Sequence, residues 1–402
     1  MTTFEKTCAL LGALVLATQA TAQEGAPDLS PAPGMSQFRV LLGNWEGSGT
    51  VWMEAGGEPQ AWTAVGTVTE ILGGHAVQED MRIDLGPELP PLEFRSLYGW
   101  DRAADRPVSF SLSNMGSGGE VTIRWVDEHT LIGVAQHVEQ GEPLAERWIA
   151  RFTKEGYAFQ LDQAKGSQPY FKHVDGRFRR SDERFDAQAQ EASVRFAPPG
   201  TEAAPMAEMK PLAGLVGSYE LAGKVRTMPD APMMDITGRE DVEWMFGGTV
   251  LASHGQGDPI EGFAWEGVGY QWWDPERACL AYLHADNMGH VATSEGRWLD
   301  EQRLIYTSAS VYQGAPLVER TIVALDEKGR IKSVSSDGIH GGHAPARGFE
   351  ATYTPKAGGA APAALVFKAG SCCDRAQKAG KTCTHACCVA AAKEGKVCAD
   401  CN

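Results

Sequence analysis

The sequence predicts an all-β protein made of two tandem antiparallel β-barrels followed by a small cysteine-rich helical tail. Three observations support this prediction: an internal repeat, short segments in which apolar and polar residues alternate, and a cluster of cysteines near the C-terminus. The chain has 402 residues, which is room for two domains of ordinary size. Because 43% of the residues are hydrophobic, each domain can form its own core.

The internal repeat consists of four motifs of the first half that recur in the second half at an offset of 173 or 174 residues. The paired positions are 41–45 with 215–219, 71–74 with 245–248, 100–101 with 273–274, and 114–116 with 287–289. Residues 176–178 have a partial match at 347–349. A constant offset is hard to obtain by chance, so we predict that one domain has been duplicated.

Each copy alternates apolar and polar residues over short segments, which is the pattern of β-strands. In residues 108–113, a valine, a phenylalanine and a leucine alternate with three serines, and residues 121–125 and 148–152 alternate in the same way. Turn signals rich in glycine and aspartate separate these segments. We expect about ten strands per copy, no long helix, and a closed meander, because closure removes unpaired edge strands.

The N-terminus has the pattern of a signal peptide. Residues 8–17 are apolar, and Ala20 and Ala22 place small residues where a cleavage site requires them, so we expect cleavage after Ala22. The predicted location is therefore the periplasm or the outside of the cell. The whole chain divides into a signal peptide (1–22), a first barrel (35–181), a linker (182–209), a second barrel (210–355), a linker (356–370) and the tail (371–402).

The formal net charge of the chain is −16. This acidic excess argues against nucleic acids and anionic membrane surfaces as partners. After the N-terminal segment, no apolar run approaches the roughly 20 residues that a transmembrane helix needs. The sequence does not predict an oligomeric state.

Gly-Asn-Trp at 43–45 resembles the Gly-x-Trp signature of the calycins, the barrel group of lipocalins and fatty-acid-binding proteins. The resemblance implies that Trp45 seals one barrel end and that an arginine of the last strand stacks on the aromatic ring, with Arg177 and Arg347 as candidates. Tyr219 replaces the tryptophan in the second copy. Together, the repeated motifs resemble the family called domain of unknown function 1579, which implies a calycin-like barrel and no established activity.

Barrels of this size either hold one small ligand or are filled by side chains. Eleven tryptophans would suit an apolar pocket, but core positions are their commoner use. His284 and His290 flank the second Asn-Met-Gly motif, and His340 and His343 could bind a metal or face a haem; we expect each to be a surface or turn residue. Cys279, within an apolar run, is expected to be buried. No catalytic motif is found, so the sequence gives no support for an enzyme.

The tail is itself a repeat, in which residues 372–383 recur at 387–398. Each unit has a Cys-Cys pair, a predicted two-turn helix, a glycine suited to end that helix, and a further cysteine. The segment has almost no large apolar side chains, so metal or cross-links must fold it. The candidate metal ligands are Cys372, Cys373, Cys383, His385, Cys387, Cys388, Cys398 and Cys401.

Two hypotheses for the tail remain open. Thiolates with one imidazole suit zinc or copper, whereas an oxidising compartment favours disulfides. We therefore predict an exported, non-enzymatic binding protein with a metal-binding tail for copper or zinc handling. The alternative is a barrel that binds or transforms a small apolar ligand, with a tail held by disulfides.

Overall fold

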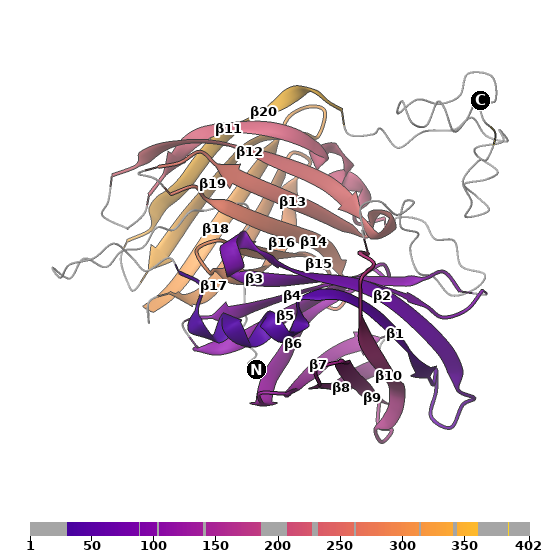
Figure 1. Cartoon of the computed structure of the whole chain (residues 1–402). Coiled ribbons are helices and arrows are strands. Elements are labelled where there is room, and N and C mark those ends of the chain that lie inside the picture. Colours follow the sequence, from indigo (N-terminus) through magenta and orange to yellow (C-terminus); the bar gives the residue numbers. More distant parts are fainter. Residues whose placement is uncertain are drawn as a thin grey trace.

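A computed structural model describes residues 30–87, 89–102, 104–139, 142–185, 207–226, 232–260, 263–312, 315–340 and 344–360, together with His385. These residues form two closed antiparallel barrels of ten strands each, shown in Figure 1. In each barrel the strands pair in chain order and the last strand pairs with the first. The structure thus confirms the predicted all-β class, the strand number and the closed meander.

The first barrel begins with the 3-10 helix η1 (Pro33–Leu41), and the turn η2 (Leu72–Gly74) joins its second and third strands. Its strands are β1 (Gly43–Val51), β2 (Gln60–Ile71), β3 (Ala76–Asp84), β4 (Leu92–Asp101), β5 (Arg106–Ser113), β6 (Gly118–Asp127), β7 (Thr130–Glu139), β8 (Glu142–Phe152), β9 (Gly156–Lys165) and β10 (Phe171–Ser181). The predicted signal peptide (1–22) lies outside the described residues.

The second barrel begins with η3 (Lys210–Leu215) and has the turn η4 (Phe246–Gly248) at the place of η2. Its strands are β11 (Gly217–Val225), β12 (Met234–Met245), β13 (Val250–Gly257), β14 (Glu266–Asp274), β15 (Cys279–Asp286), β16 (Val291–Asp300), β17 (Arg303–Tyr312), β18 (Ala315–Leu325), β19 (Ile331–His340) and β20 (Ala346–Ala360). The tail, apart from His385, and most of both predicted linkers lie outside the described residues.

The turns η2 and η4 show that the sequence repeat encodes the same backbone twice. Leu72 and Phe246 have φ angles of 54° and 52°, and the two glycines after each have φ angles of 65° and 90° in one copy and 65° and 87° in the other. Positive φ costs glycine little, which explains the repeated Gly-Gly. Positive φ is unfavourable for a leucine or phenylalanine. Leu72 and Phe246 adopt it with their side chains buried, so burial of these side chains offsets the cost.

The aromatic residue of each Gly-x-aromatic motif bonds to the 3-10 helix that precedes its barrel. The indole Nε1 of Trp45 donates a hydrogen bond to the carbonyl of Leu41 at 2.7 Å. The hydroxyl of Tyr219 donates to the carbonyl of Leu215 at 2.8 Å. Both aromatic side chains are buried, and both acceptors lie in the 3-10 helix that precedes the barrel. Tyrosine therefore keeps the polar contact of the tryptophan that it replaces.

The arginine that stacks on Trp45 is Arg180, so the prediction of Arg177 is wrong. The Arg180 guanidinium lies 4.6 Å from the indole centroid. Trp45 pairs directly with Arg180 across the sheet, whereas Arg177, three residues earlier on β10, points to the other face because strand side chains alternate. In the second barrel the paired position holds Pro355, and Arg347 instead forms an ion pair within its own sheet.

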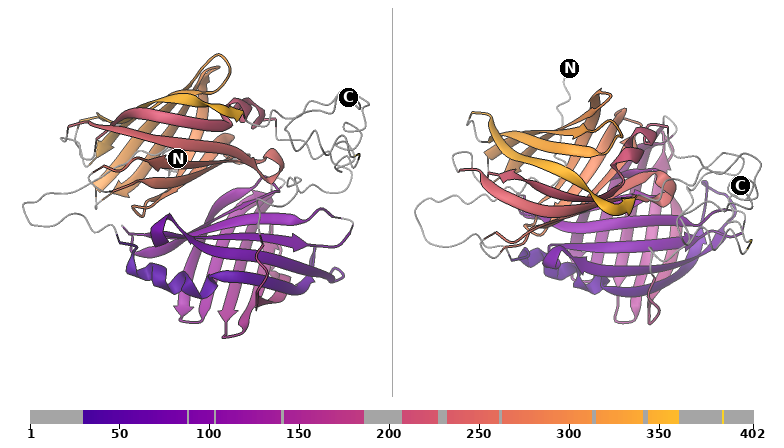
Figure 2. Two further views of the ribbon diagram at one scale, coloured as in Figure 1. Left: turned by 45° about the horizontal axis from the view of Figure 1, so that its top comes forward. Right: turned by 90° about the horizontal axis from the view of Figure 1, so that it is seen from above.

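The two barrels share an apolar interface, seen between the stacked barrels in Figure 2. The apolar face of β5 points outward into this interface, and its serines face the barrel interior, because Ser109 pairs with the core residue Tyr98. The interface core consists of Leu97, Val108, Phe110 and Leu112 from the first barrel and Phe246, Val250, Ala252, Tyr270, Trp272, Ala281 and Leu283 from the second. In the described part of the chain, no helix has the length and apolar character to span a membrane.

Candidate functional site

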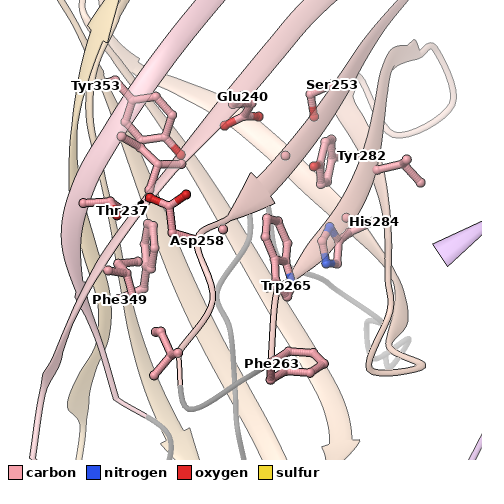
Figure 3. A pocket seen from close by; sticks show the side chains of 17 residues that line it. Thr237, Glu240, Ser253, Asp258, Phe263, Trp265, Tyr282, His284, Phe349 and Tyr353 are labelled. Atoms are coloured by element: carbon pink, nitrogen blue, oxygen red, sulfur yellow. Dashed lines mark hydrogen bonds between the residues drawn. The ribbon is translucent and has the colours of Figure 1, made fainter. Parts of the chain in front are cut away.

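The second barrel contains a partly enclosed cavity of about 40 Å³. A single water needs roughly 10–15 Å³ on this measure, so the cavity has room for a few waters or one small organic group. Figure 3 shows Glu240 at one end, Phe263 at the other, Tyr353 along one side and Tyr282 along the opposite side. The lining residues come from β11, β12, β13, β14, β15, β20 and the loop before β14.

Beside the cavity, glycines replace large side chains on two neighbouring strands. Gly255 and Gly267 are paired across β13 and β14. At the equivalent pair of the first barrel stand Met81 and Phe94. An added Cβ would come within 2.8 Å of the Trp265 ring at Gly255 and within 2.5 Å at Gly267. The glycines therefore leave the space into which the Trp265 indole folds.

Aromatic rings form much of the cavity wall. The rings of Trp265 and His284 are stacked with centroids 6.2 Å apart and planes 12° apart. Tyr282 lies beyond the imidazole, with centroids 6.5 Å apart. A Cβ at Gly269 would lie 1.9 Å from the Tyr282 hydroxyl, so only glycine permits this ring position. The result is a row of three rings along one side of the cavity.

Glu240 brings a carboxyl group to the buried end of the cavity. Its side chain is 3% exposed, and Oε1 has no hydrogen-bond partner among the described residues. Burial raises the pKa of Glu240 to about 7, although hydrogen bonds from Tyr353 and Ser253 act in the opposite direction. A buried acceptor without a partner is costly. Near neutral pH this carboxyl group can thus exchange a proton or accept a bond from a bound molecule.

A second polar cluster surrounds Asp286, which is 1% exposed at the end of β15. Its Oδ2 lies 3.1 Å from Nδ1 of His290 and 3.4 Å from Nε2 of His284. Burial would raise the pKa of Asp286, but the charge of His290 and the hydrogen bonds from both imidazoles hold it well below its usual value. Burial lowers the pKa of His290, but Asp286 outweighs this and raises it. Asp286 therefore holds His284 against the cavity.

Beside its apolar core, the second barrel's interior contains further polar groups. Three buried hydroxyls, those of Ser294, Thr321 and Ser336, have no hydrogen-bond partner among the described side chains and backbone. Glu319 also faces this interior, where burial raises its pKa against a hydrogen bond from Ser308. Buried polar groups usually have hydrogen-bond partners. Water or a polar ligand inside this barrel could bond to the three hydroxyls, which an aliphatic core would not allow.

The interior of the first barrel is filled instead by aromatic rings. Tyr157 and Phe178 stack with centroids 4.5 Å apart and planes 9° apart. Trp45 meets Tyr157 edge-on at 5.0 Å, and Trp62 lies 5.6 Å from Phe178. Such packing is typical of a barrel plugged by its own side chains.

The first barrel also buries one carboxyl group, that of Glu79, but this group is fully bonded by its neighbours. Its Oε2 accepts a 2.8 Å hydrogen bond from the Tyr98 hydroxyl. Burial raises the pKa of Glu79 to about 6, against hydrogen bonds from Tyr98 and Ser96. The equivalent of Glu79 in the second barrel is Ser253, and the two buried acids therefore occupy different positions of the repeat.

A wider groove of about 760 Å³ opens along β1, β2, β9 and β10 of the first barrel. It is exposed to solvent, and charged groups at its edge are already paired: Arg179 lies 2.6 Å from Glu46, which also accepts a 2.7 Å hydrogen bond from Ser181. The second barrel's cavity is the better candidate, because it combines partial enclosure with a buried polar atom that lacks a partner.

Most of the predicted metal ligands cannot be placed. The tail cysteines lie outside the described residues, and His385 is exposed. No group of three histidine, cysteine, aspartate or glutamate side chains in the described ranges is arranged to hold a metal ion. Cys279 is 1% exposed, as predicted, and burial raises its pKa to about 11.

The histidine predictions have mixed outcomes. His284 is not a surface residue, since its side chain is 12% exposed and lines the cavity. His290 lies at the turn before β16, as predicted, and is half-buried by its contact with Asp286. His340 ends β19, and position 343 lies outside the described residues.

Sequence reasoning missed Glu240 and Asp286. The signal that could have found them is a position-by-position comparison of the two copies. Glu240 stands where the first copy has Gly66, and Asp286 stands where it has Ser113. An acid that replaces a small residue at an inward position marks a chemical difference between the two barrel interiors.

The model of one protein family, described as "Protein of unknown function (DUF1579)", matches residues 31–134 and 204–335. No curated protein shows significant sequence similarity to the chain. Among solved structures, the protein Rv2717c of M. tuberculosis is similar, with 13% identity and a TM-score of 0.31, over 38% of this chain and 99% of that one. A protein of unknown function from the DUF3598 family of Nostoc punctiforme PCC 73102 has 13% identity and a TM-score of 0.24, over 80% of this chain and 98% of that one.

Proposed function

The chain belongs to the DUF1579 family of proteins of unknown function, and from this premise we propose that it is a binding protein whose second barrel holds a small molecule. One observation carries the proposal: the cavity ends at a buried carboxyl oxygen, Glu240 Oε1, that has no partner among the described residues. A ligand that donates a hydrogen bond there would remove the cost of this unsatisfied acceptor. The calycin-like character inferred from the Gly-x-Trp motif is consistent with such a role.

Binding is a better proposal than catalysis. The cavity wall has an imidazole, that of His284, held by Asp286, but no serine or cysteine among the described residues forms a hydrogen bond with that ring. Nucleophilic catalysis requires such a contact. The second barrel is preferred to the first because aromatic rings occupy the interior of the first, as the stack of Tyr157 on Phe178 illustrates.

The test is a ligand titration followed by tryptophan fluorescence, since Trp265 is part of the cavity wall. A panel of small amphipathic molecules is added to the full chain, to a Trp265→Phe variant and to a Trp62→Phe variant of the first barrel. We expect a saturable signal that Trp265→Phe abolishes and Trp62→Phe retains. A signal that depends on Trp62, or no saturable signal from any class of molecule, would contradict the proposal.

A plugged cavity provides an independent check. Gly255→Met installs the residue that the first copy has at the equivalent position, Met81. Because a Cβ there already lies 2.8 Å from Trp265, the longer side chain must occupy cavity space. We expect the variant to fold, as judged by circular dichroism, and to lose ligand binding. Unchanged binding in this variant would place the ligand elsewhere.

For the tail, we propose metal binding by the seven cysteines and His385, on the strength of the doubled Cys-Cys repeat. Soft thiolates suit copper or zinc. The test compares the metal content and mass of the full chain with those of a variant ending at Gly370. Metal that disappears with the truncation supports the proposal, and a metal-free tail whose mass is lower by two protons per bridge would establish disulfides instead.

For location, we propose export to the periplasm or beyond, from the apolar segment 8–17 and the small residues Ala20 and Ala22. N-terminal sequencing of the protein from cell fractions tests this. We expect a mature chain that begins at Gln23 in the exported fraction. An intact N-terminus in the cytoplasmic fraction would contradict export.

A further inference from the structure

The acidic side chains around the cavity favour a positively charged ligand. The ionisable side chains among its described lining residues are Glu240, Asp258 and His284, with no lysine or arginine. Asp258 lies exposed at the mouth, where its amide donates to the carbonyl of Thr237 at 2.8 Å and its carboxylate accepts a hydrogen bond from the Thr237 hydroxyl. One acid thus stands at the buried end and a second at the entrance.

The aromatic lining favours the same sign. The rings of Trp265, Tyr282, Phe349 and Tyr353 line the cavity (Figure 3). Aromatic faces carry negative potential and attract ammonium groups, with tryptophan the strongest. Carboxylates combined with several ring faces are a typical environment for an organic cation.

The other ligand classes fit less well. An anion would meet Glu240 and Asp258 without a lysine or arginine among the described lining residues, and the imidazole of His284 is already bonded to Asp286. An aliphatic ligand would leave the buried Glu240 Oε1 without a partner. The net charge of −16 also raises the local concentration of cations near the protein.

We propose that the ligand of the second barrel is a small organic ammonium ion, whose positive group lies beside Glu240 and against the rings of Trp265 and Tyr282. This inference rests on the proposed function of the second barrel as a binding site. It adds the chemical class of the ligand, which the cavity alone does not define. Because Glu240 has a pKa of about 7, binding of a cation should release a proton near neutral pH.

The test uses the full chain and three probes of nearly the same shape: choline, its uncharged carbon analogue dimethylbutanol, and the anion dimethylbutanoate. Isothermal titration calorimetry gives the affinity of each. We expect choline to bind at least about tenfold more tightly than dimethylbutanol, since a desolvated cation–π contact and a carboxylate each contribute to the difference. Dimethylbutanoate should not bind. The affinity for choline should rise with pH through about 7 as Glu240 loses its proton.

Two variants locate the effect. Glu240→Gln should reduce the preference for choline over dimethylbutanol to the part that the aromatic rings supply, and Glu79→Gln, which alters the buried acid of the first barrel, should leave the full preference unchanged. Trp265→Leu is a second variant in case Glu240→Gln does not fold, and it should weaken choline binding more than dimethylbutanol binding.

The outcomes separate the two proposals. If dimethylbutanol binds as tightly as choline, or if Glu240→Gln keeps the full preference, the second barrel remains a binding site but the inference of a cationic ligand is wrong. If none of the three probes binds, the cationic inference also fails, and the wider ligand panel decides the proposed function. Preference for choline that depends on Glu240 and not on Glu79 supports both.

Discussion

The guanidinium of Arg95 on β4 lies over the ring of Tyr270 on β14, 5.6 Å from its centroid, and joins the two barrels. Arg95 Nη1 also donates to the Tyr270 hydroxyl at 3.3 Å, and Arg95 Nε lies 2.6 Å from a carboxylate oxygen of Asp80. The Arg95 and Asp80 side chains are 11% and 17% exposed. A buried ion pair thus lies within the apolar interface, and the two barrels should unfold as one unit.

Replacing Arg95 should weaken this coupling. Arg95→Met keeps the apolar stem but leaves the buried Asp80 carboxylate without its charge partner, which costs about 3 kcal/mol. We expect urea denaturation to show a lower midpoint and two separable transitions. The double variant with Asp80→Asn should recover most of the loss, because no unpaired charge remains. A single variant as stable as the wild type would show that the barrels are not coupled through this pair.

The stack of Arg180 on Trp45 allows a comparison with a nearby arginine. Arg180 also donates to the carbonyls of Leu42 at 2.6 Å and Val40 at 3.1 Å, at the end of η1. Because Arg180 is exposed, we expect Arg180→Ala to lower the free energy of unfolding by only about 1 kcal/mol. Arg177→Ala, on the opposite face of β10, should have no measurable effect in the same denaturation experiment. Equal losses in the two variants would refute the assignment of Arg180 as the stacking residue.

The Asp286–His290 contact should make stability depend on pH. The pKa of His290 is raised in the folded state. The stabilisation that His290 gives the folded protein is therefore fully present below the unfolded pKa of about 6.5, and it is lost as pH rises through the folded pKa. Asp286 has a lowered pKa and remains ionised throughout this range. Asp286→Asn should therefore cost roughly 2 kcal/mol at about pH 5.5 and less at about pH 8.5. Urea denaturation of both proteins at the two pH values measures this, and a difference that does not change with pH would contradict it.

The fold could be predicted from the sequence because its signals are local. The motif Gly-Gly after Leu72 and after Phe246 fixes a backbone turn wherever it occurs, and strand alternation needs only neighbouring residues. Whether the apolar face of a strand points into its own barrel or toward the other barrel could not be predicted in the same way. The apolar residues at 108, 110 and 112 contact the other barrel, and this contact involves residues more than a hundred positions away.

The candidate site was not predicted because it is assembled from distant strands. Glu240, Tyr282 and Tyr353 line one cavity but lie on β12, β15 and β20. None belongs to a motif that the sequence marks, and Glu240 looks like any surface acid in a strand with many charges. Strand pairing brings these residues together, and the replacement of Met81 and Phe94 by glycines in the second copy leaves space beside the cavity.

The buried acid Glu240 should itself make stability depend on pH. Its pKa is about 7 in the folded protein and about 4.3 in an unfolded chain, so the folded state holds the proton more tightly. The contribution of Glu240 to stability is then fully present below about pH 4.3 and is lost as pH rises through about 7, by roughly 4 kcal/mol in total. Glu240→Gln cannot ionise, so we expect its stability relative to the wild type to rise steadily from about pH 4 to about pH 7 and to stay higher above about pH 8.

Glu79 provides the matched control for this prediction, because it is also buried but has a folded pKa of about 6. Glu79→Gln should remove the part of the pH dependence of stability that ends near pH 6. The part between about pH 6 and 7 should remain, because it comes from Glu240. Urea denaturation of the three proteins from about pH 5 to 8.5 separates the two contributions. If the wild type and Glu240→Gln lose stability equally between about pH 6 and 7, Glu240 is ionised throughout that range. Its carboxyl group would then have access to solvent through the cavity.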